Sequence, residues 1–327
     1  MARQQPDRNL ALELVRVTEA AALAASRWMG RGDKDGADRA AVEAMRVVLG
    51  TVTMDGVVVI GEGEKDHAPM LYNGERLGDG SPPQVDIAVD PIDGTTLTAL
   101  GRGNALSVIA MSERGTMFNP GPCVYMEKIA VGPDAAGAID ITRSPTENLE
   151  SVAKALGKPV RDLTAVILDR DRHADLIAEV RAAGARIRLI PDGDVAGAIS
   201  TAWPESGADI LFGIGGTPEG VVAAAALKCM GGEIQGRFLP SNDAELERLK
   251  SMGGDPKKIY RTNDLAPGRQ MVFAATGITH GELLEGVRYF GGGARTHSIV
   301  MGYATQVVRF IDSIHLLERG ARVNIRV

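Results

Sequence analysis

The chain alternates short apolar runs with longer segments in which apolar residues recur every three or four positions. The short runs are rich in Val and Ile and predict strands over residues 57–60, 85–89, 106–111, 165–168, 187–190, 210–212, 272–275 and 298–301. The longer segments have a helical period and predict helices over residues 9–29, 38–49, 146–156, 171–183 and 218–230. Strands that alternate with helices indicate an α/β or layered α+β fold.

The length of the chain suggests more than one domain. At roughly 150 residues per domain, 327 residues correspond to two. A predicted helix and two prolines lie within residues 143–159 and separate two strand-rich halves. We therefore expect an N-terminal domain of residues 1–155 and a C-terminal domain of residues 156–327.

Composition and charge exclude several classes of protein. There are 36 Lys and Arg against 42 Asp and Glu, giving a net charge of −6, and no basic run that would bind nucleic acid. The longest wholly apolar run, residues 221–227, is far shorter than the ~18 residues of a membrane span. The first residues lack the apolar stretch of a signal peptide, so a cytoplasmic protein is expected. Cys123 and Cys229 lie far apart, and two thiols are favoured over a disulfide.

The most distinctive segment covers residues 85–96. A buried-looking strand ends at Asp90, Pro91 is expected to stop the strand, and Asp93 and Thr95 follow. Two carboxylates three residues apart, with a hydroxyl beside them, suit Mg²⁺, which prefers oxygen ligands. The alternative is an Asx turn that leads the chain out of the strand.

Two further acidic segments could hold a cation. Glu62, Glu64 and Asp66 follow the strand predicted over residues 57–60, and three acids so close repel one another unless a cation neutralises them. A solvated acidic turn is the alternative. Asp38 opens the helix predicted over residues 38–49, where an acid is a typical N-cap or first-turn residue, but it could also face a metal.

Glycine occurs 40 times and stands at the ends of apolar runs, where turns or a close approach to a ligand require it. Residues 187–198 and 212–220 each read as a strand, a glycine-rich turn and a helix. Backbone N–H groups and a helix N-terminus can hold an anion in that geometry. Glu219, in the first turn of the second of these helices, is by default a partner of the helix dipole.

Four side chains could contact a phosphorylated sugar. Arg170 and Arg172 stand at a strand end and could grip a phosphate. The Tyr125 hydroxyl could reach a sugar, or the ring could be half-buried in the structure. His173 could touch the substrate, although an exposed position at a helix start is the simpler interpretation.

Taken together, these strings resemble the class II fructose-1,6-bisphosphatases, a family of the lithium-sensitive, metal-dependent phosphomonoesterase superfamily. The resemblance extends from residue 10 to residue 315. It rests on residues 30–34, 59–64, 68–72, 89–95, 125–128, 191–196, 213–220 and 275–279. It implies alternating αβαβα layers and a homodimer or homotetramer.

The resemblance also implies roles for individual residues. The metal, Mg²⁺ or Mn²⁺, would be bound by Asp38, Glu62, Asp90, Asp93 and Glu219. The substrate would be bound by Asp93, Gly94, Thr95, Tyr125, Arg170, Asp171, Arg172, Asp192, Gly193, Asp194 and Gly216. Thr95 would orient the attacking water, with Lys34, Glu64 and Asp66 as further candidates for catalytic roles. The N-terminal domain would then bind the metal and the C-terminal domain the substrate.

Two positions depart from the pattern of some family members. Asp93 stands where some members have the longer Glu. Asp171 lies between two arginines where others have Lys-Pro-Arg, which weakens the case for a substrate contact by Asp171.

The activity implied is metal-dependent hydrolysis of the 1-phosphate of fructose 1,6-bisphosphate, which yields fructose 6-phosphate and phosphate in gluconeogenesis. The expected partner is this sugar bisphosphate, with no nucleic acid and no membrane. The alternatives are a sedoheptulose-1,7-bisphosphatase, an inositol monophosphatase-like or phosphoadenosine phosphatase, or a catalytically silent protein that binds sugar phosphates.

Overall fold

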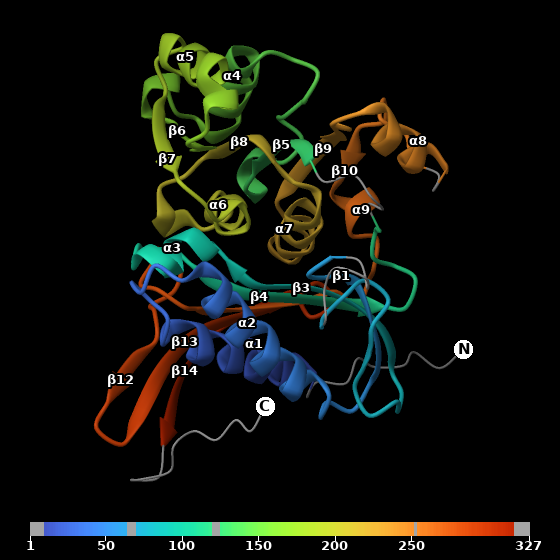
Figure 1. The fold of residues 1–327 in the computed structure, drawn as a ribbon. Helices are drawn as coiled ribbons and strands as arrows, with labels where there is room; N and C mark the ends of the chain where they lie inside the picture. Colours follow the sequence, from blue (N-terminus) through green and yellow to red (C-terminus); the bar gives the residue numbers. More distant parts are fainter. Residues whose placement is uncertain (1–9, 64–69, 120–124, 252–253, 317–327) are drawn as a thin grey trace. The chain divides into compact units, whose positions relative to one another are not determined.

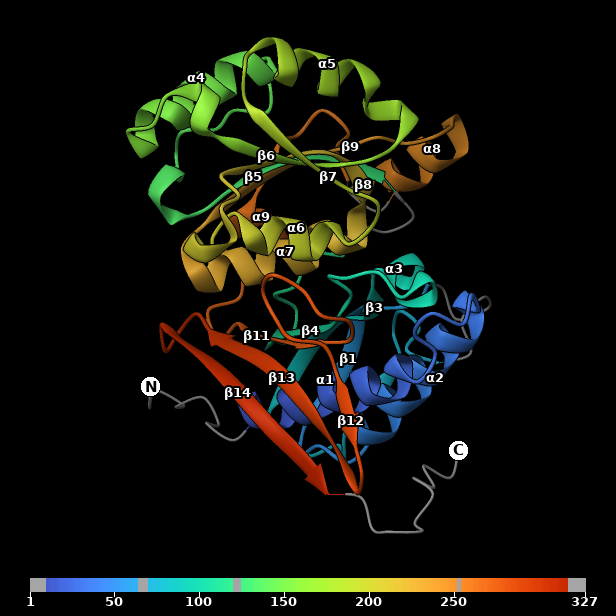
Figure 2. The same ribbon diagram turned by 90° about the vertical axis from the view of Figure 1, so that its left-hand side faces the viewer.

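The computed structural model describes residues 10–63, 70–119, 125–251 and 254–316 (Figures 1 and 2). The chain forms two compact units. The first comprises Met1–Thr116 and Gly268–Val327, and the second comprises Met117–Pro267.

This division differs from the boundary predicted between residues 155 and 156. The reason is β5 (Tyr125–Val131), a strand that the apolar pattern does not reveal because Glu127 and Lys128 interrupt its apolar residues. It lies inside the sheet of the second unit, so the chain enters that unit well before the predicted boundary. After residue 267 the chain returns to the sheet of the first unit.

The first unit contains a sheet of eight described strands. These are β1 (Asp55–Ile60), β2 (Arg76–Leu77), β3 (Gln84–Asp93), β4 (Leu106–Glu113), β11 (Val272–Gly277), β12 (Arg288–Phe290), β13 (Gly293–Gly302) and β14 (Val307–Leu316). Their order is β12-β13-β11-β4-β3-β1-β2, and β14 also pairs with β13. β1 runs parallel to β3, and the other pairs of described strands are antiparallel. β4 is buried almost throughout, which is why it has a continuous apolar pattern.

Two helices, α1 (Leu10–Ser26) and α2 (Lys34–Leu49), cover one face of this sheet (Figure 1). The apolar stripe predicted for α1 is buried as expected and comprises Leu10, Leu14, Val17 and Ala21. One polar contact crosses this core, where the Thr18 and Thr276 hydroxyls lie 2.7 Å apart. Apolar packing together with paired polar groups therefore fixes α1 against the sheet.

The start of α2 corrects the interpretation of Asp38. The N-cap is Asp33, whose carboxylate accepts a hydrogen bond from the Gly36 N–H at 2.8 Å. The helix therefore begins at Lys34, and Asp38 lies in its second turn, so Asp38 is neither an N-cap nor a first-turn acid. Because Asp38 stands four residues after the first residue of the helix, its side chain does not cap the helix.

The second unit contains a sheet of six described strands in the order β10-β9-β5-β8-β6-β7. Besides β5, these are β6 (Thr164–Leu168), β7 (Arg186–Ile190), β8 (Ile210–Gly216), β9 (Glu233–Phe238) and β10 (Tyr260–Arg261). β6, β7 and β8 run parallel to one another. β5 is antiparallel to both of its neighbours.

Helices cover both faces of this sheet (Figure 2). α4 (Pro145–Leu156) and α5 (Ala174–Ala182) lie on one face, and α6 (Asp194–Ser200) and α7 (Thr217–Met230) lie on the other. Most of α7 is buried on all sides, as its continuous apolar sequence predicts. The unit also contains α8 (Asp243–Ser251), α9 (Thr262–Leu265) and the 3₁₀ turns Pro133–Ala135, Val160–Asp162, Asp171–His173 and Pro204–Ser206. No helix among the described residues is long and apolar enough to cross a membrane.

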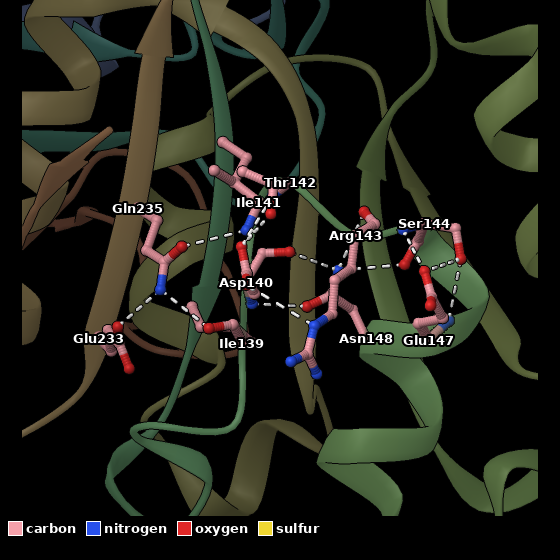
Figure 3. A network of polar contacts seen from close by, with 10 residues as sticks. All are labelled: Ile139, Asp140, Ile141, Thr142, Arg143, Ser144, Glu147, Asn148, Glu233 and Gln235. Atoms are coloured by element: carbon pink, nitrogen blue, oxygen red, sulfur yellow. Dashed lines mark hydrogen bonds and ion pairs between the residues drawn. The ribbon is translucent and has the colours of Figure 1, made fainter. Parts of the chain in front are cut away.

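A buried polar network, which we call the Asn148–Gln235 network, fixes the chain between the turn Pro133–Ala135 and α4 (Figure 3). The Asn148 amide donates to the Asp140 carbonyl at 2.9 Å and accepts from the Asp140 N–H at 2.8 Å. The Gln235 amide accepts from the Ile141 N–H at 3.0 Å and donates to the Ile139 carbonyl at 2.8 Å. These two side chains replace the backbone pairing that an irregular segment lacks.

Every predicted strand and helix is present in the described residues, with shifted ends. The largest shift is the start of β13 at Gly293 instead of residue 298, and the start of α2, the end of β3 and the end of β8 each differ from the prediction by four residues. Cys123 lies outside the described residues, so the expectation of two thiols stays a prediction.

Candidate active site

The end of β3 has an irregular backbone that displays two of the predicted acids. Asp90 is paired with Val108 of β4, and Asp93 is paired with Leu106, so three residues of β3 match two of β4. This is a β-bulge, and Pro91 lies inside it, which is why the strand continues beyond the position where the proline was expected to end it. A bulge redirects side chains at a strand end, and it places the two carboxylates at a distorted point of the sheet.

The turn after this bulge matches the Asx-turn interpretation in part. Asp90 Oδ1 accepts a hydrogen bond from the Ile92 N–H at 3.0 Å, so Asp90 forms an Asx turn. Gly94 has φ +102°, a left-handed conformation that favours glycine, and it precedes α3 (Thr95–Leu100). Thr95 is therefore the first residue of a short helix, and its hydroxyl donates to the Ile92 carbonyl at 3.3 Å.

The structure brings Lys34 to this turn. Its ammonium group donates to the Thr96 hydroxyl at 2.9 Å. The preceding loop is fixed to α3 by the Gly30 and Gly32 N–H groups, which donate to the Thr98 and Ala99 carbonyls at 3.0 and 2.8 Å. Sequence motifs around residues 30–34 and 93–96, separated by some sixty residues in the chain, are therefore neighbours in space.

Glu62 lies at the same edge of the sheet as Asp90. β1 and β3 are parallel, and Ile60 is paired with Ala88, so Glu62 and Asp90 each stand two residues beyond a paired position. The carboxyl ends of parallel strands meet at one sheet edge, where α/β proteins bind ligands. Glu64 and Asp66 lie outside the described residues.

Asp38 is half-buried in α2. Burial and the nearby carboxylate of Asp35 raise the pKa of Asp38 above its usual value. A carboxylate that is costly to ionise by itself would be stabilised by a cation.

In the second unit, strand direction gathers most of the predicted substrate residues at one edge of the sheet. The parallel strands β6, β7 and β8 end at this edge, and the antiparallel β5 begins there, with Tyr125 paired with Gly216. The residues at this edge are Tyr125, Arg170, Asp171, Arg172, Asp192, Gly193, Asp194 and Gly216.

The two arginines contact neighbouring segments of this edge. Arg172 donates to the Ile214 carbonyl through Nη2 at 2.7 Å and through Nε at 3.2 Å. Its guanidinium lies 5.6 Å from the centre of the Tyr125 ring, within the range of a cation–π contact. Arg170 and Asp192 form a long ion pair at 4.0 Å. Asp171 is exposed between the arginines.

His173 stands at the start of α5 as expected, but it is buried, with 1% of its surface exposed, so the expectation of an exposed position is wrong. Its Nδ1 lies 2.7 Å from the Leu168 carbonyl, and its Nε2 accepts from the Ile214 N–H at 2.8 Å. Burial lowers the pKa of the imidazole. A Cβ at Gly213 would lie 3.1 Å from the ring, so that glycine makes room for the histidine.

At the start of α7, two buried oxygen atoms have no hydrogen-bond partner among the described residues. They are Oε2 of Glu219 and Oγ1 of Thr217. Burial, followed by the charge of Asp194, raises the pKa of Glu219, while the ammonium group of Lys128 opposes that rise. Asn73, Ser107 and Gln270 each also have a buried oxygen without a partner among the described residues, so it is the predicted role of Glu219 as a metal ligand that distinguishes this position.

We call Lys128, Asp194, Thr217 and Glu219 the Glu219 cluster. Its lysine donates to Asp194 and to the Gly216 carbonyl. Sequence reasoning gave Lys128 no role, although it ends the string of residues 125–128 that supports the family resemblance. Gly215 and Gly216 stand where added Cβ atoms would overlap the carboxylates of Asp194 and Glu219. Glycine is therefore required at both positions to leave room for side chains of the cluster. The sequence pattern alone did not reveal this requirement.

Within the part of the chain that the structure describes, no three His, Cys, Asp or Glu side chains form a group that could hold a metal ion. The predicted ligands are instead divided between the two units, with Asp38, Glu62, Asp90 and Asp93 in the first and Glu219 in the second.

Comparison with known proteins identifies the family. Residues 8–315 match the family of bacterial fructose-1,6-bisphosphatases, glpX-encoded. The chain belongs to this family. It is 49% identical to fructose-1,6-bisphosphatase 1 class 2 of Escherichia coli K12 over 325 residues, which cover 95% of this chain and 96% of that protein. The fructose-1,6-bisphosphatase class 2 of Shigella flexneri is equally similar over the same share of each chain. The resemblance stated from the sequence is confirmed.

Proposed function

We propose that the protein hydrolyses the 1-phosphate of fructose 1,6-bisphosphate and releases fructose 6-phosphate and phosphate. The observation that carries this proposal is the 49% identity, over nearly the whole of both chains, to proteins named fructose-1,6-bisphosphatase class 2. The gathered arginines and turns at one edge of the second sheet support it, because a phosphorylated sugar needs cationic and backbone donors.

The proposed cofactor is Mg²⁺ or Mn²⁺, bound by Asp38, Glu62, Asp90, Asp93 and Glu219. The donor set fits this chemistry, because it consists of carboxylates, and because Glu219 has a buried oxygen with no partner among the described residues. When bound, such an ion polarises phosphoryl oxygens and lowers the pKa of a water ligand.

The protein's own residues would position the reactants. Thr95, at the start of α3, would hold the attacking water, and the neighbouring Lys34 would fix that turn through Thr96. Glu64 and Asp66 remain the proposed partners for proton transfer. In the second unit, Arg170 and Arg172 would bind the phosphate that is kept.

Recognition of the sugar would fall to the turns of the second unit. Tyr125 is exposed, and the guanidinium of Arg172 lies over its ring. Asp192, Gly193, Asp194 and Gly216 follow β7 and β8, where carboxylate and backbone groups could bind sugar hydroxyls. Asp93 and Gly94 would complete the contacts, and Asp171 is the weakest member of the proposed set because it departs from the family pattern.

The deciding experiment is phosphate release from fructose 1,6-bisphosphate with Mg²⁺, with Mn²⁺ and with EDTA, beside inositol 1-phosphate and sedoheptulose 1,7-bisphosphate. We expect metal-dependent release from fructose 1,6-bisphosphate. Release from inositol 1-phosphate alone would overturn the substrate but keep a metal-dependent phosphatase. No release from any substrate would favour a silent binding protein.

We further propose that the enzyme serves gluconeogenesis in the cytoplasm as a homodimer or homotetramer. Hydrolysis of the 1-phosphate suits a biosynthetic pathway such as gluconeogenesis, because removal of a phosphate by water is effectively irreversible. Size-exclusion chromatography with light scattering tests the oligomeric state, and a monomer would contradict it.

A further inference from the structure

Lys128 lies in the middle of β5, and its ammonium group is buried. Side chains alternate along a strand, so Ile129 and Val131 enter the apolar core that includes α4, while Lys128 points to the opposite face. There its stem lies against α7, where a Cβ at Gly220 would be 3.2 Å from Cδ of the lysine. A buried cation is stable only beside acceptors, so its partners reveal what it does.

Both partners of the ammonium group belong to turns in the proposed substrate site. Nζ donates to Oδ2 of Asp194, at the start of α6, and to the carbonyl oxygen of Gly216, 3.0 Å away, at the start of α7. These turns follow two different strands, β7 and β8. One side chain thus fixes the position of one turn relative to the other.

The backbone of β8 is built around this contact. A Cβ at Gly215 would overlap Oδ2 of Asp194 and would lie 2.9 Å from Nζ of Lys128. Any larger residue at this position would displace the ion pair. The glycine pattern of residues 213–216 therefore serves the Lys128–Asp194 pair as well as the turn itself.

We propose that Lys128 is a positioning residue, which holds Asp194 and Gly216 in the arrangement that receives the sugar phosphate. This proposal rests on the proposed function. Lys128 is only 4% exposed, so it acts through these two residues instead of touching the substrate.

The test compares Lys128→Met with Lys158→Met. Methionine keeps an unbranched stem and removes the charge. Lys158 forms the matched control, because it pairs with Asp209 at 2.6 Å in the same unit and bonds to no residue of the proposed site. We measure KM and kcat for fructose 1,6-bisphosphate, the affinity of the metal-free protein for fructose 6-phosphate by calorimetry, and the unfolding temperature.

For Lys128→Met, we expect KM to rise about tenfold and the affinity for fructose 6-phosphate to fall by a similar factor, because charge-assisted hydrogen bonds that hold the turns are lost. We expect kcat to change less than KM. Lys158→Met should keep both values within about twofold of the wild type, since surface ion pairs contribute little.

Wild-type KM and affinity in a folded Lys128→Met protein would overturn the proposal. Lys128→Arg provides a second variant, which keeps the charge with a larger head group and should shift KM in the same direction by a smaller factor. If both Lys128 variants fail to fold while Lys158→Met folds, Lys128 serves the core and the proposal is overturned. A wild-type protein that leaves fructose 1,6-bisphosphate intact would instead refute the proposed function.

Discussion

The second unit contains two sets of buried polar side chains, which differ in whether their hydrogen-bonding atoms have partners. In the Asn148–Gln235 network (Figure 3), the side-chain amides of both residues are paired with backbone groups. In the Glu219 cluster, two buried oxygens have no partner among the described residues. An unpaired buried polar group costs about 1–3 kcal/mol, whereas a saturated one stabilises the fold. The difference distinguishes a saturated structural network from the cluster that contains the proposed metal ligand Glu219.

The largest effect should come from Glu219→Gln, which keeps the size of the side chain and removes its charge. We expect kcat/KM for fructose 1,6-bisphosphate to fall about 100-fold or more, because a proposed metal ligand is lost. The matched control is Glu179→Gln, whose carboxylate accepts from the Thr146 N–H and hydroxyl. Glu179 belongs to α5, which lies on the face of the sheet opposite to α7 (Figure 2). Equal kinetics for the two variants would remove Glu219 from the site.

The same variant should not lose stability in the metal-free state. Burial raises the pKa of Glu219 in the folded protein above its unfolded value near 4.5. A raised pKa for an acid means that the ionised group weakens the fold as pH rises above the unfolded value. The amide does not titrate, so at pH 7 the unfolding temperature of the variant should equal or exceed that of the wild type.

The structural network should behave in the opposite way. Gln235→Leu would leave the Ile141 N–H and the Ile139 carbonyl without their partners. We expect the free energy of unfolding to fall by about 2–3 kcal/mol, with kcat/KM of the folded protein within about twofold of the wild type. Denaturant unfolding at a fixed temperature measures the loss. A large kinetic defect with unchanged stability would contradict the assignment of this network.

A smaller effect is expected for Thr217→Val, which removes the buried unpaired hydroxyl and keeps the branched shape. Because a buried hydroxyl without a partner is costly, the metal-free protein should become about 1 kcal/mol more stable. Loss of stability would show that the hydroxyl has a partner, and that the contrast between the two groups is overstated.

The smallest effect concerns pH. Burial lowers the pKa of His173 in the folded protein below its ordinary value of 6.5. Its contribution to stability is therefore complete above pH 6.5 and is lost as pH falls below that value. Unfolding measured at pH 8, 7, 6 and 5 should show a steeper decline for the wild type than for His173→Gln. Parallel curves would contradict this account.

The apolar pattern was enough to predict the strands and helices whose buried apolar residues form an uninterrupted run or stripe. Runs such as residues 106–111 became β4, and the stripe along residues 10–21 became the buried face of α1. β5 escaped because Glu127 and Lys128 interrupt its apolar residues, and with it the boundary between the units was misplaced. Polar residues in a buried strand are explained only by partners from other segments, which periodicity cannot show.

The sequence motifs shared with the family predicted which residues form the candidate site. They did not predict its local geometry. Asp33, and not Asp38, is the N-cap of α2, because the carboxylate of Asp33 accepts the hydrogen bond from the Gly36 N–H. His173 is buried because Gly213 leaves room for it. The His173 outcome depends on a tertiary contact, which a single sequence does not contain, whereas the Asp33 cap is a local contact within three residues.

We propose that the unpaired oxygen of Glu219 binds the metal ion. Calorimetric titration with Mn²⁺ of the metal-free wild type, Glu219→Gln and Gln235→Leu measures this binding. We expect Glu219→Gln to weaken Mn²⁺ binding about tenfold or more, while Gln235→Leu binds as the wild type does. Wild-type affinity in Glu219→Gln would contradict it.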